Sequence, residues 1–208
     1  MEEFKAKRAA EAEAEKAKRI AEAKRVFEQL PKFTDSRDSK VYRKVTIGGK
    51  TWMAENLNFA AEGSTCYENN AGNCDKYGRL YNWTTALSAC PAGYHLPSDD
   101  EWTELENAVG GRSTAGTKLK STVGWNGNGN GTNDFGFLAL PGGSGYSDGS
   151  FRGAVDFGFL ASNFGSWWSA AEISTDLAWY RGMDYAYGEV NRNNNFKTNL
   201  LSVRCVED

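Results

Sequence analysis

The residue types best able to do chemistry here are one histidine, four cysteines and a few neighbouring carboxylates. His95 stands directly before a candidate helix start, where we expect a hydrogen-bonded structural imidazole and not a general base. Asp99 and Asp100 fall in the first turn of that helix, where a carboxylate is stabilised by the positive end of the helix dipole. A single histidine also excludes a multi-histidine metal site. We therefore expect no catalytic residue and no metal site, and we do not expect an enzyme.

The cysteines suggest a disulfide framework. Cys66 and Cys74 bound the polar segment CYENNAGNC, which suits a small disulfide-closed loop, and Cys90 and Cys205 would then close most of the remaining chain. An even count without a Cys-x-x-Cys pair favours disulfides over zinc binding or redox catalysis. Free buried thiols and metal binding stay open as alternatives. Two disulfides would imply an oxidising compartment, so we expect an extracellular or cell-surface protein.

The segment 125–134 (WNGNGNGTND) places Asn and Asp oxygens close together. Ca²⁺ prefers oxygen ligands, but this segment lacks the spacing and the closing Glu of an EF-hand. A series of Asn-Gly turns explains the composition adequately. We expect structural turns and no cofactor, with Ca²⁺ binding as the alternative.

Aromatic rings, amides and charges gather between residues 167 and 199. Rings pack on sugar faces or peptide surfaces, and Asn, Asp and Arg orient polar groups. A purely structural aromatic–asparagine cluster is the competing interpretation, and we expect Trp168 and Trp179 in the core. The predicted ligand-binding residues are Trp167, Tyr180, Arg181, Asp184, Tyr185, Tyr187, Asn191, Asn193 and Asn194.

Strands at both ends and two early helices must position these residues. The alternating segment 40–47, a Gly48-Gly49 turn and the segment 50–53 predict a hairpin. One helix is expected at 84–90, and a second begins at Ser98, which forms a capping box with Glu101. Trp102, Leu105 and Val109 of the second helix share one face.

The second half of the chain is rich in glycine between residues 110 and 165. We expect long loops and no regular helix there, apart from a short buried strand at 135–140. Strands are expected at 167–169, 178–183 and 200–206, with a polar loop at 189–195. This order of elements predicts an α+β fold.

Residues 1–32 are rich in Ala, Glu, Lys and Arg and predict a charged helical stalk that ends at Pro31. The stalk lacks the Leu or Ile seam of a strong coiled coil. Self-association or partner binding through residues 1–30 is therefore only the alternative.

The formal net charge of −3 gives no basic footprint for nucleic acid. No apolar run reaches the roughly 18 residues of a membrane span. The stalk also lacks the apolar core of a signal peptide, so secretion would need an upstream signal or anchor.

Six segments occur in fixed order: TWMAENLNF, DKYGRLYNW, CPAGYHLPSDDEW, NDFGFLALPGG, WWS and SVRCV. Together they closely resemble the Fibrobacter succinogenes major paralogous domain, over residues 33–208. CPAGYHLPSDDEW is more distantly similar to the formylglycine-generating-enzyme (sulfatase-modifying) family, whose late pair of reactive cysteines is missing here. The resemblance implies a C-type-lectin-like fold with paired terminal strands, small twisted antiparallel sheets, two helices and a long glycine-rich loop region. A Cys90–Cys205 bridge resembles the long disulfide of that fold.

The resemblance also implies a secreted or surface-anchored bacterial protein of undefined biochemical role. We therefore expect a non-catalytic module that binds a glycan or a protein at the cell surface. A structural or assembly module of a cell-surface complex is the alternative. The asparagine run before the last strand also resembles the variable proteins of diversity-generating retroelements, which makes a diversified ligand-binding protein a further alternative.

Overall fold

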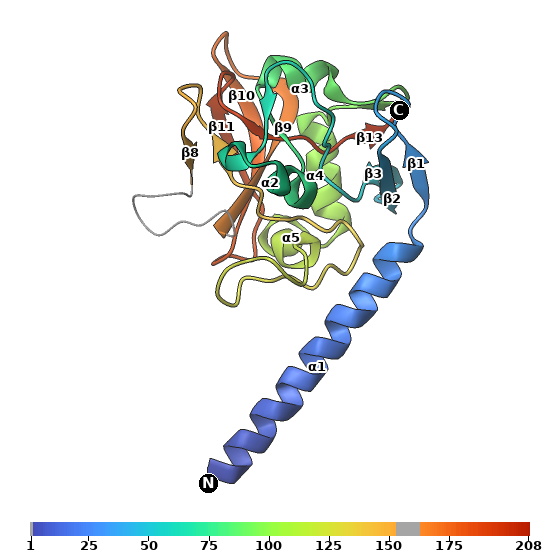
Figure 1. Ribbon diagram of the computed structural model, residues 1–208, viewed down its shortest axis with the longest axis vertical. Coiled ribbons are helices and arrows are strands. Elements are labelled where there is room, and N and C mark those ends of the chain that lie inside the picture. Colours follow the sequence, from blue (N-terminus) through green and yellow to red (C-terminus); the bar gives the residue numbers. More distant parts are fainter. Residues whose placement is uncertain (1, 153–162) are drawn as a thin grey trace.

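The computed structural model describes residues 2–152 and 163–208, so part of the glycine-rich region, 153–162, lies outside the described residues. Helix α1 (Glu2–Gln29) projects from the rest of the protein as an extended arm (Figure 1). It ends just before Pro31, as predicted, because proline cannot continue the helical hydrogen bonding. At this end the guanidinium carbon of Arg43 lies 4.5 Å from the centre of the Phe27 ring. The last turn of the arm is therefore attached to the body of the protein.

A five-stranded antiparallel sheet joins the two ends of the body. The predicted hairpin is confirmed, with Ile47 paired to Lys50 across Gly48 and Gly49. Both glycines have positive φ, which suits glycine in a tight turn. The C-terminal strand lies beside this hairpin, as the resemblance implies. In spatial order the strands are β1 (Lys32–Thr34), β2 (Val41–Ile47), β3 (Lys50–Met53), β13 (Val206–Glu207) and β6 (Tyr94–His95).

A six-stranded sheet contains the longest strands of the second half of the chain. The expected strands at 167–169 and 178–183 are confirmed as parts of a long β9–β10 hairpin. The expected strand at 200–206 is instead divided between the two sheets. In spatial order the strands are β11 (Asn191–Phe196), β10 (Leu177–Asp184), β9 (Phe164–Glu172), β12 (Leu201–Ser202), β5 (Leu80–Tyr81) and β4 (Ser64–Thr65).

The prediction of a loop at 189–195 was wrong, because β11 pairs with β10 over its whole length. Most side chains of this strand are exposed, so its polar sequence is tolerated, and backbone pairing with β10 stabilises it. The expected strand at 135–140 was also wrong, since among the described residues Ala139 makes only an isolated bridge with Lys120. A further short hairpin joins β7 (Ser144–Gly145) to β8 (Phe151–Arg152).

Helices α3 (Trp83–Ala89) and α4 (Asp99–Ala108) confirm the two predicted helices. The capping box of α4 is also confirmed, with Ser98 and Glu101 in the expected roles. Helix α5 (Arg112–Leu119) contradicts the expectation of no regular helix in the glycine-rich region. Its Gly116 packs so closely on the backbone carbonyl of Glu189 that a Cβ atom would collide with it. Between Cys66 and Cys74 the chain forms η1 (Tyr67–Asn69) and then begins α2 (Ala71–Tyr77).

Both predicted disulfides are present, Cys66–Cys74 and Cys90–Cys205. The described residues form two core clusters. One contains Trp52, Trp102 and Trp167 with residues of α4 and α5, and the other surrounds Trp168 beneath α3. The six-stranded sheet separates them, because successive side chains of β9 point to opposite faces.

Candidate functional site

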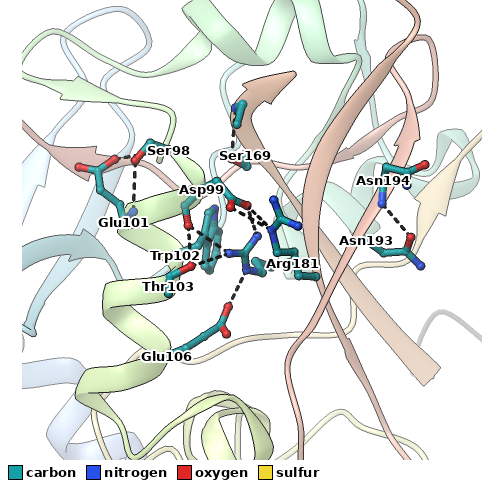
Figure 2. Close-up of polar contacts among 12 residues, drawn as sticks. Ser98, Asp99, Glu101, Trp102, Thr103, Glu106, Ser169, Arg181, Asn193 and Asn194 are labelled. Carbon is teal, nitrogen blue, oxygen red and sulfur yellow. Dashed lines mark hydrogen bonds and ion pairs between the residues drawn. The ribbon is translucent and has the colours of Figure 1, made fainter. Parts of the chain in front are cut away.

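Arg181 of β10 is the centre of a buried ionic network against α4 (Figure 2). Its Nη1 donates to Asp99 at 2.6 Å and its Nε to Glu106 at 2.5 Å. Its Nη2 donates to the Thr103 hydroxyl at 3.1 Å. The guanidinium thus ties the sheet to α4. The prediction that Arg181 contacts a ligand was wrong, because its side chain is only 1% exposed.

Trp167 was also wrongly placed in the ligand-binding set. It is completely buried, and its indole Nε1 donates to the Asn56 side chain at 2.8 Å. Trp168, on the opposite face of β9, is buried as predicted. Both rings are core residues because β9 is an interior strand covered on both faces.

Trp179 is half-buried and was wrongly expected in the core. The guanidinium carbon of Arg192, on β11, lies 3.4 Å from the centre of its ring. The Arg192 Nε donates to both carboxylate oxygens of Asp99, at 2.9 and 3.0 Å. Asp99 therefore holds Arg192 over the indole while it also binds Arg181. Arg192 and Trp179 were absent from the predicted set, although their proximity to the asparagine run could have drawn attention to them.

The predicted asparagines lie together on β11, the edge strand of the sheet. Asn193 and Asn194 are exposed and Asn191 is half-buried. Side chains alternate along a strand, so Arg192 and Asn194 share one face with Phe196, which is 59% exposed. We call the set Trp179, Arg192, Asn194 and Phe196 the β11 surface; Asn193, paired with Tyr180, lies on the opposite face.

The asparagines also mask the free edge of β11. The Asn193 Oδ1 accepts the backbone N–H of Asn194 at 2.8 Å (Figure 2). The Asn195 Oδ1 accepts the N–H of Phe196 at 2.9 Å. These two amides are two residues apart and so point to the same edge, away from β10. Unpaired edge amides are a template for pairing with another chain, and these side chains occupy them.

The remaining predicted residues are divided between the sheet and the turn after β10. Tyr180 is half-buried and packs against the cluster around Trp168. Asp184 and Tyr185 are half-buried, whereas Tyr187 is 61% exposed. Lys120 holds this turn, because its Nζ donates to the carbonyls of Asp184 and Tyr187, each at 2.9 Å. Burial lowers the pKa of Lys120.

In segment 125–134, the side-chain oxygens of Asn126, Asn130 and Asn133 accept backbone N–H groups. The Asn126 Oδ1 accepts the N–H of Gly127 at 2.8 Å, and the Asn130 Oδ1 accepts that of Trp125 at 3.0 Å. This arrangement supports the structural-turn interpretation over Ca²⁺ binding. No group of three or more His, Cys, Asp or Glu side chains in the described part of the chain is placed to hold a metal ion.

His95 bridges two carboxylates at the C-terminal strand. Its Nδ1 lies 2.7 Å from Asp208 and its Nε2 3.0 Å from Glu101. Partial burial disfavours the charged imidazole, but the hydrogen bonds to Asp208 and Glu101 outweigh this effect and raise the pKa of His95. Both ring nitrogens are occupied, as expected for a structural histidine.

A cleft of about 350 Å³ lies elsewhere, between the end of α1, β2 and α2. Its walls carry both apolar and charged side chains, including Phe27, Val41, Tyr42, Lys76 and Tyr77. It is an alternative to the β11 surface as a place where a ligand could bind.

The helices within residues 2–152 and 163–208 include none that is both long enough and apolar enough to cross a membrane. The chain matches a family model described as the Fibrobacter succinogenes major domain over residues 45–207. No curated protein and no solved structure matches it.

Proposed function

Since the chain belongs to the Fibrobacter succinogenes major domain family, we propose that it is a non-catalytic binding module, secreted or at the cell surface, with the β11 surface as its ligand site. The observation that carries the proposal is the stack of Arg192 on Trp179, held in place by Asp99. A charged group and an aromatic ring are thus fixed at the surface beside the exposed Asn194. Binding then costs less conformational entropy than it would with mobile side chains.

We further propose that the body has a C-type-lectin-like fold. Three features support this assignment: β3 pairs with the C-terminal β13, helices α3 and α4 adjoin the sheets, and Cys90–Cys205 ties the end of α3 to the last strands. The two disulfides support an extracellular location, because such bonds persist in oxidising compartments.

The state of the most reactive side chains supports a non-catalytic role. All four cysteines are in disulfides, so no thiolate is available for the chemistry of formylglycine-generating enzymes. Asp99 is occupied by Arg181 and Arg192, and Glu106 is buried against Arg181.

The proposal is tested with purified, oxidised chain on an array of plant and bacterial glycans and against a displayed library of random peptides. We expect at least one class of ligand whose binding is lost in Arg192→Ala and Trp179→Ala. The same binding should persist in Arg25→Ala, which removes an exposed arginine of α1. No ligand of either class, or a ligand insensitive to both β11 changes, would refute the proposal.

An assembly role is the second candidate, favoured by the projection of α1 (Figure 1). Among the arm's side chains whose burial is described, the half-buried ones are Ile20, Ala23 and Phe27, all in its C-terminal half. Deleting residues 1–22 keeps Phe27 on Arg43 and removes most of the arm. An oligomer that dissociates on this deletion would favour assembly, and an unchanged monomer would exclude it.

Retroelement diversification is supported only by the exposure of Asn193 and Asn194 on one strand. A template repeat and a reverse-transcriptase gene beside the coding sequence would support this alternative. Their absence would remove it.

A further inference from the structure

We propose that the ligand of the β11 surface is a protein segment bearing a carboxylate, which Arg192 binds, and a large apolar side chain, which packs beside Phe196. This inference rests on the proposed function and specifies the chemistry of its ligand.

Arg192 is fixed in a geometry suited to a carboxylate. Its Nε is occupied by Asp99, and its guanidinium plane is positioned by Trp179. Within the described part of the chain, neither Nη atom has a hydrogen-bond partner, and the side chain is 37% exposed. Terminal guanidinium nitrogens form paired hydrogen bonds with carboxylates, and a stacked arginine loses less freedom on doing so.

The local charge balance leaves Arg192 able to bind a second acid. Asp99 is shared between Arg181 and Arg192, and Glu106 is buried against Arg181 alone. The two arginines and two carboxylates are formally neutral as a set. Arg192 is the exposed member of the set, and Asp99 contacts only its Nε. An incoming carboxylate can therefore reach the two Nη atoms without displacing Asp99.

The other end of the β11 surface is apolar. Phe196 pairs with Leu177, whose carbonyl accepts the backbone N–H of Ile173 at 2.8 Å. Phe196 is 59% and Ile173 42% exposed. Arg192 and Phe196 are four positions apart on one face, which at a rise of roughly 3.4 Å per residue places them about 14 Å apart. An extended segment would span this distance with an acidic residue four positions from an apolar one.

These features favour a protein over a glycan. Arg192 covers one face of the Trp179 ring, so a sugar cannot stack there. An exposed Phe on the same sheet face as a Trp–Arg pair matches the composition of protein-binding surfaces, where Trp and Arg contribute much of the affinity. Salt should weaken such binding, since one exposed ion pair is formed.

The test is a selection of random linear peptides displayed on phage against the oxidised full chain. We expect the selected sequences to share Asp or Glu four positions from a large apolar residue. A synthetic selected peptide should bind Arg192→Gln at least about tenfold more weakly, because one partner of a charge pair is lost. It should bind Arg25→Gln, the charge-matched control on α1, as tightly as wild type.

Three controls make the outcomes distinct. Replacing the acidic residue of the peptide by its amide should weaken binding as much as Arg192→Gln does. Arg192→Lys keeps the charge without the planar fork and should give an intermediate loss. Thermal unfolding of each variant confirms that it is folded. Selected peptides without an acidic residue, no selected peptides, or equal binding to Arg192→Gln would overturn this inference. A glycan bound through the β11 surface would overturn it while leaving the proposed function intact.

Discussion

Arg204 and Asn56, 148 residues apart in the sequence, meet in the core through hydrogen bonds of 2.6 and 3.1 Å from the guanidinium to the Asn56 Oδ1. The same oxygen accepts the indole N–H of Trp167. Burial lowers the pKa of Arg204 to about 9, and its remaining donors reach backbone carbonyls of Met53, Phe137 and Leu138. The motifs TWMAENLNF, NDFGFLALPGG, WWS and SVRCV thus converge on one buried polar centre, which gives their fixed order a structural cause.

Asn56→Ala should therefore be strongly destabilising. The change leaves a buried guanidinium and a buried indole N–H without their shared acceptor, which costs about 3 kcal/mol of unfolding free energy. Urea unfolding measures the loss. Asn58→Ala is the matched control, because the hydrogen bonds of Asn58 in the described chain use its backbone. An equal, small effect of both changes would contradict the structural role of this centre.

The two disulfides should contribute unequally to stability. Cys90–Cys205 closes a separation of 115 residues and Cys66–Cys74 one of 8. Loop-closure entropy predicts losses of about 5 and about 2.5 kcal/mol when the pairs are replaced by alanine. Urea unfolding of the two double variants gives the order. A larger loss from the short loop would show that strain or residual structure outweighs chain entropy.

Stability should depend on pH through His95, the only histidine. Its pKa is raised in the folded state, so its stabilising contribution is complete below the unfolded value of 6.5 and is lost as pH rises through the folded value. The difference in unfolding free energy between wild type and His95→Gln should shrink from pH 6 to pH 9. A difference that is constant over this range would mean that the charge of His95 has no part in holding Asp208 and Glu101.

The edge asparagines should protect β11 from pairing with other chains. Asn193→Ala with Asn195→Ala frees the N–H groups of Asn194 and Phe196, so hydrogen exchange at both should accelerate and self-association should rise. Asn194→Ala is the control, since its side chain accepts neither amide. Unchanged exchange in the double variant would show that the two side chains do not protect the edge.

The sequence was most informative where local chemistry decides the structure. Ser98 and Glu101 specified the start of α4, and Gly48-Gly49 specified a hairpin. Prediction from the sequence failed where contacts with residues distant in the sequence decide the local structure. Nothing local to 191–196 predicts a strand, because β11 owes its conformation to pairing with β10. Similarly, α5 tolerates Gly116 because Glu189 packs against it.

The candidate site was only half predictable for the same reason. The asparagines of β11 were expected to be accessible, and Asn193 and Asn194 are. The sequence does not indicate which of two adjacent tryptophans, such as Trp167 and Trp168, will be buried. Both are buried, in different core clusters. Asp99 and Glu106 pair with Arg181, and Asp99 also fixes Arg192. Both carboxylates come from α4, some 80 residues earlier in the sequence.

The most direct test of the β11 surface is nuclear magnetic resonance titration of ¹⁵N-labelled chain with a ligand selected as described above. We predict that the largest shift changes fall on the Trp179 indole N–H, the Arg192 Nε–H and the amides of Asn193 and Asn194. Changes centred instead on the cleft lined by Val41, Tyr42 and Tyr77 would contradict the account.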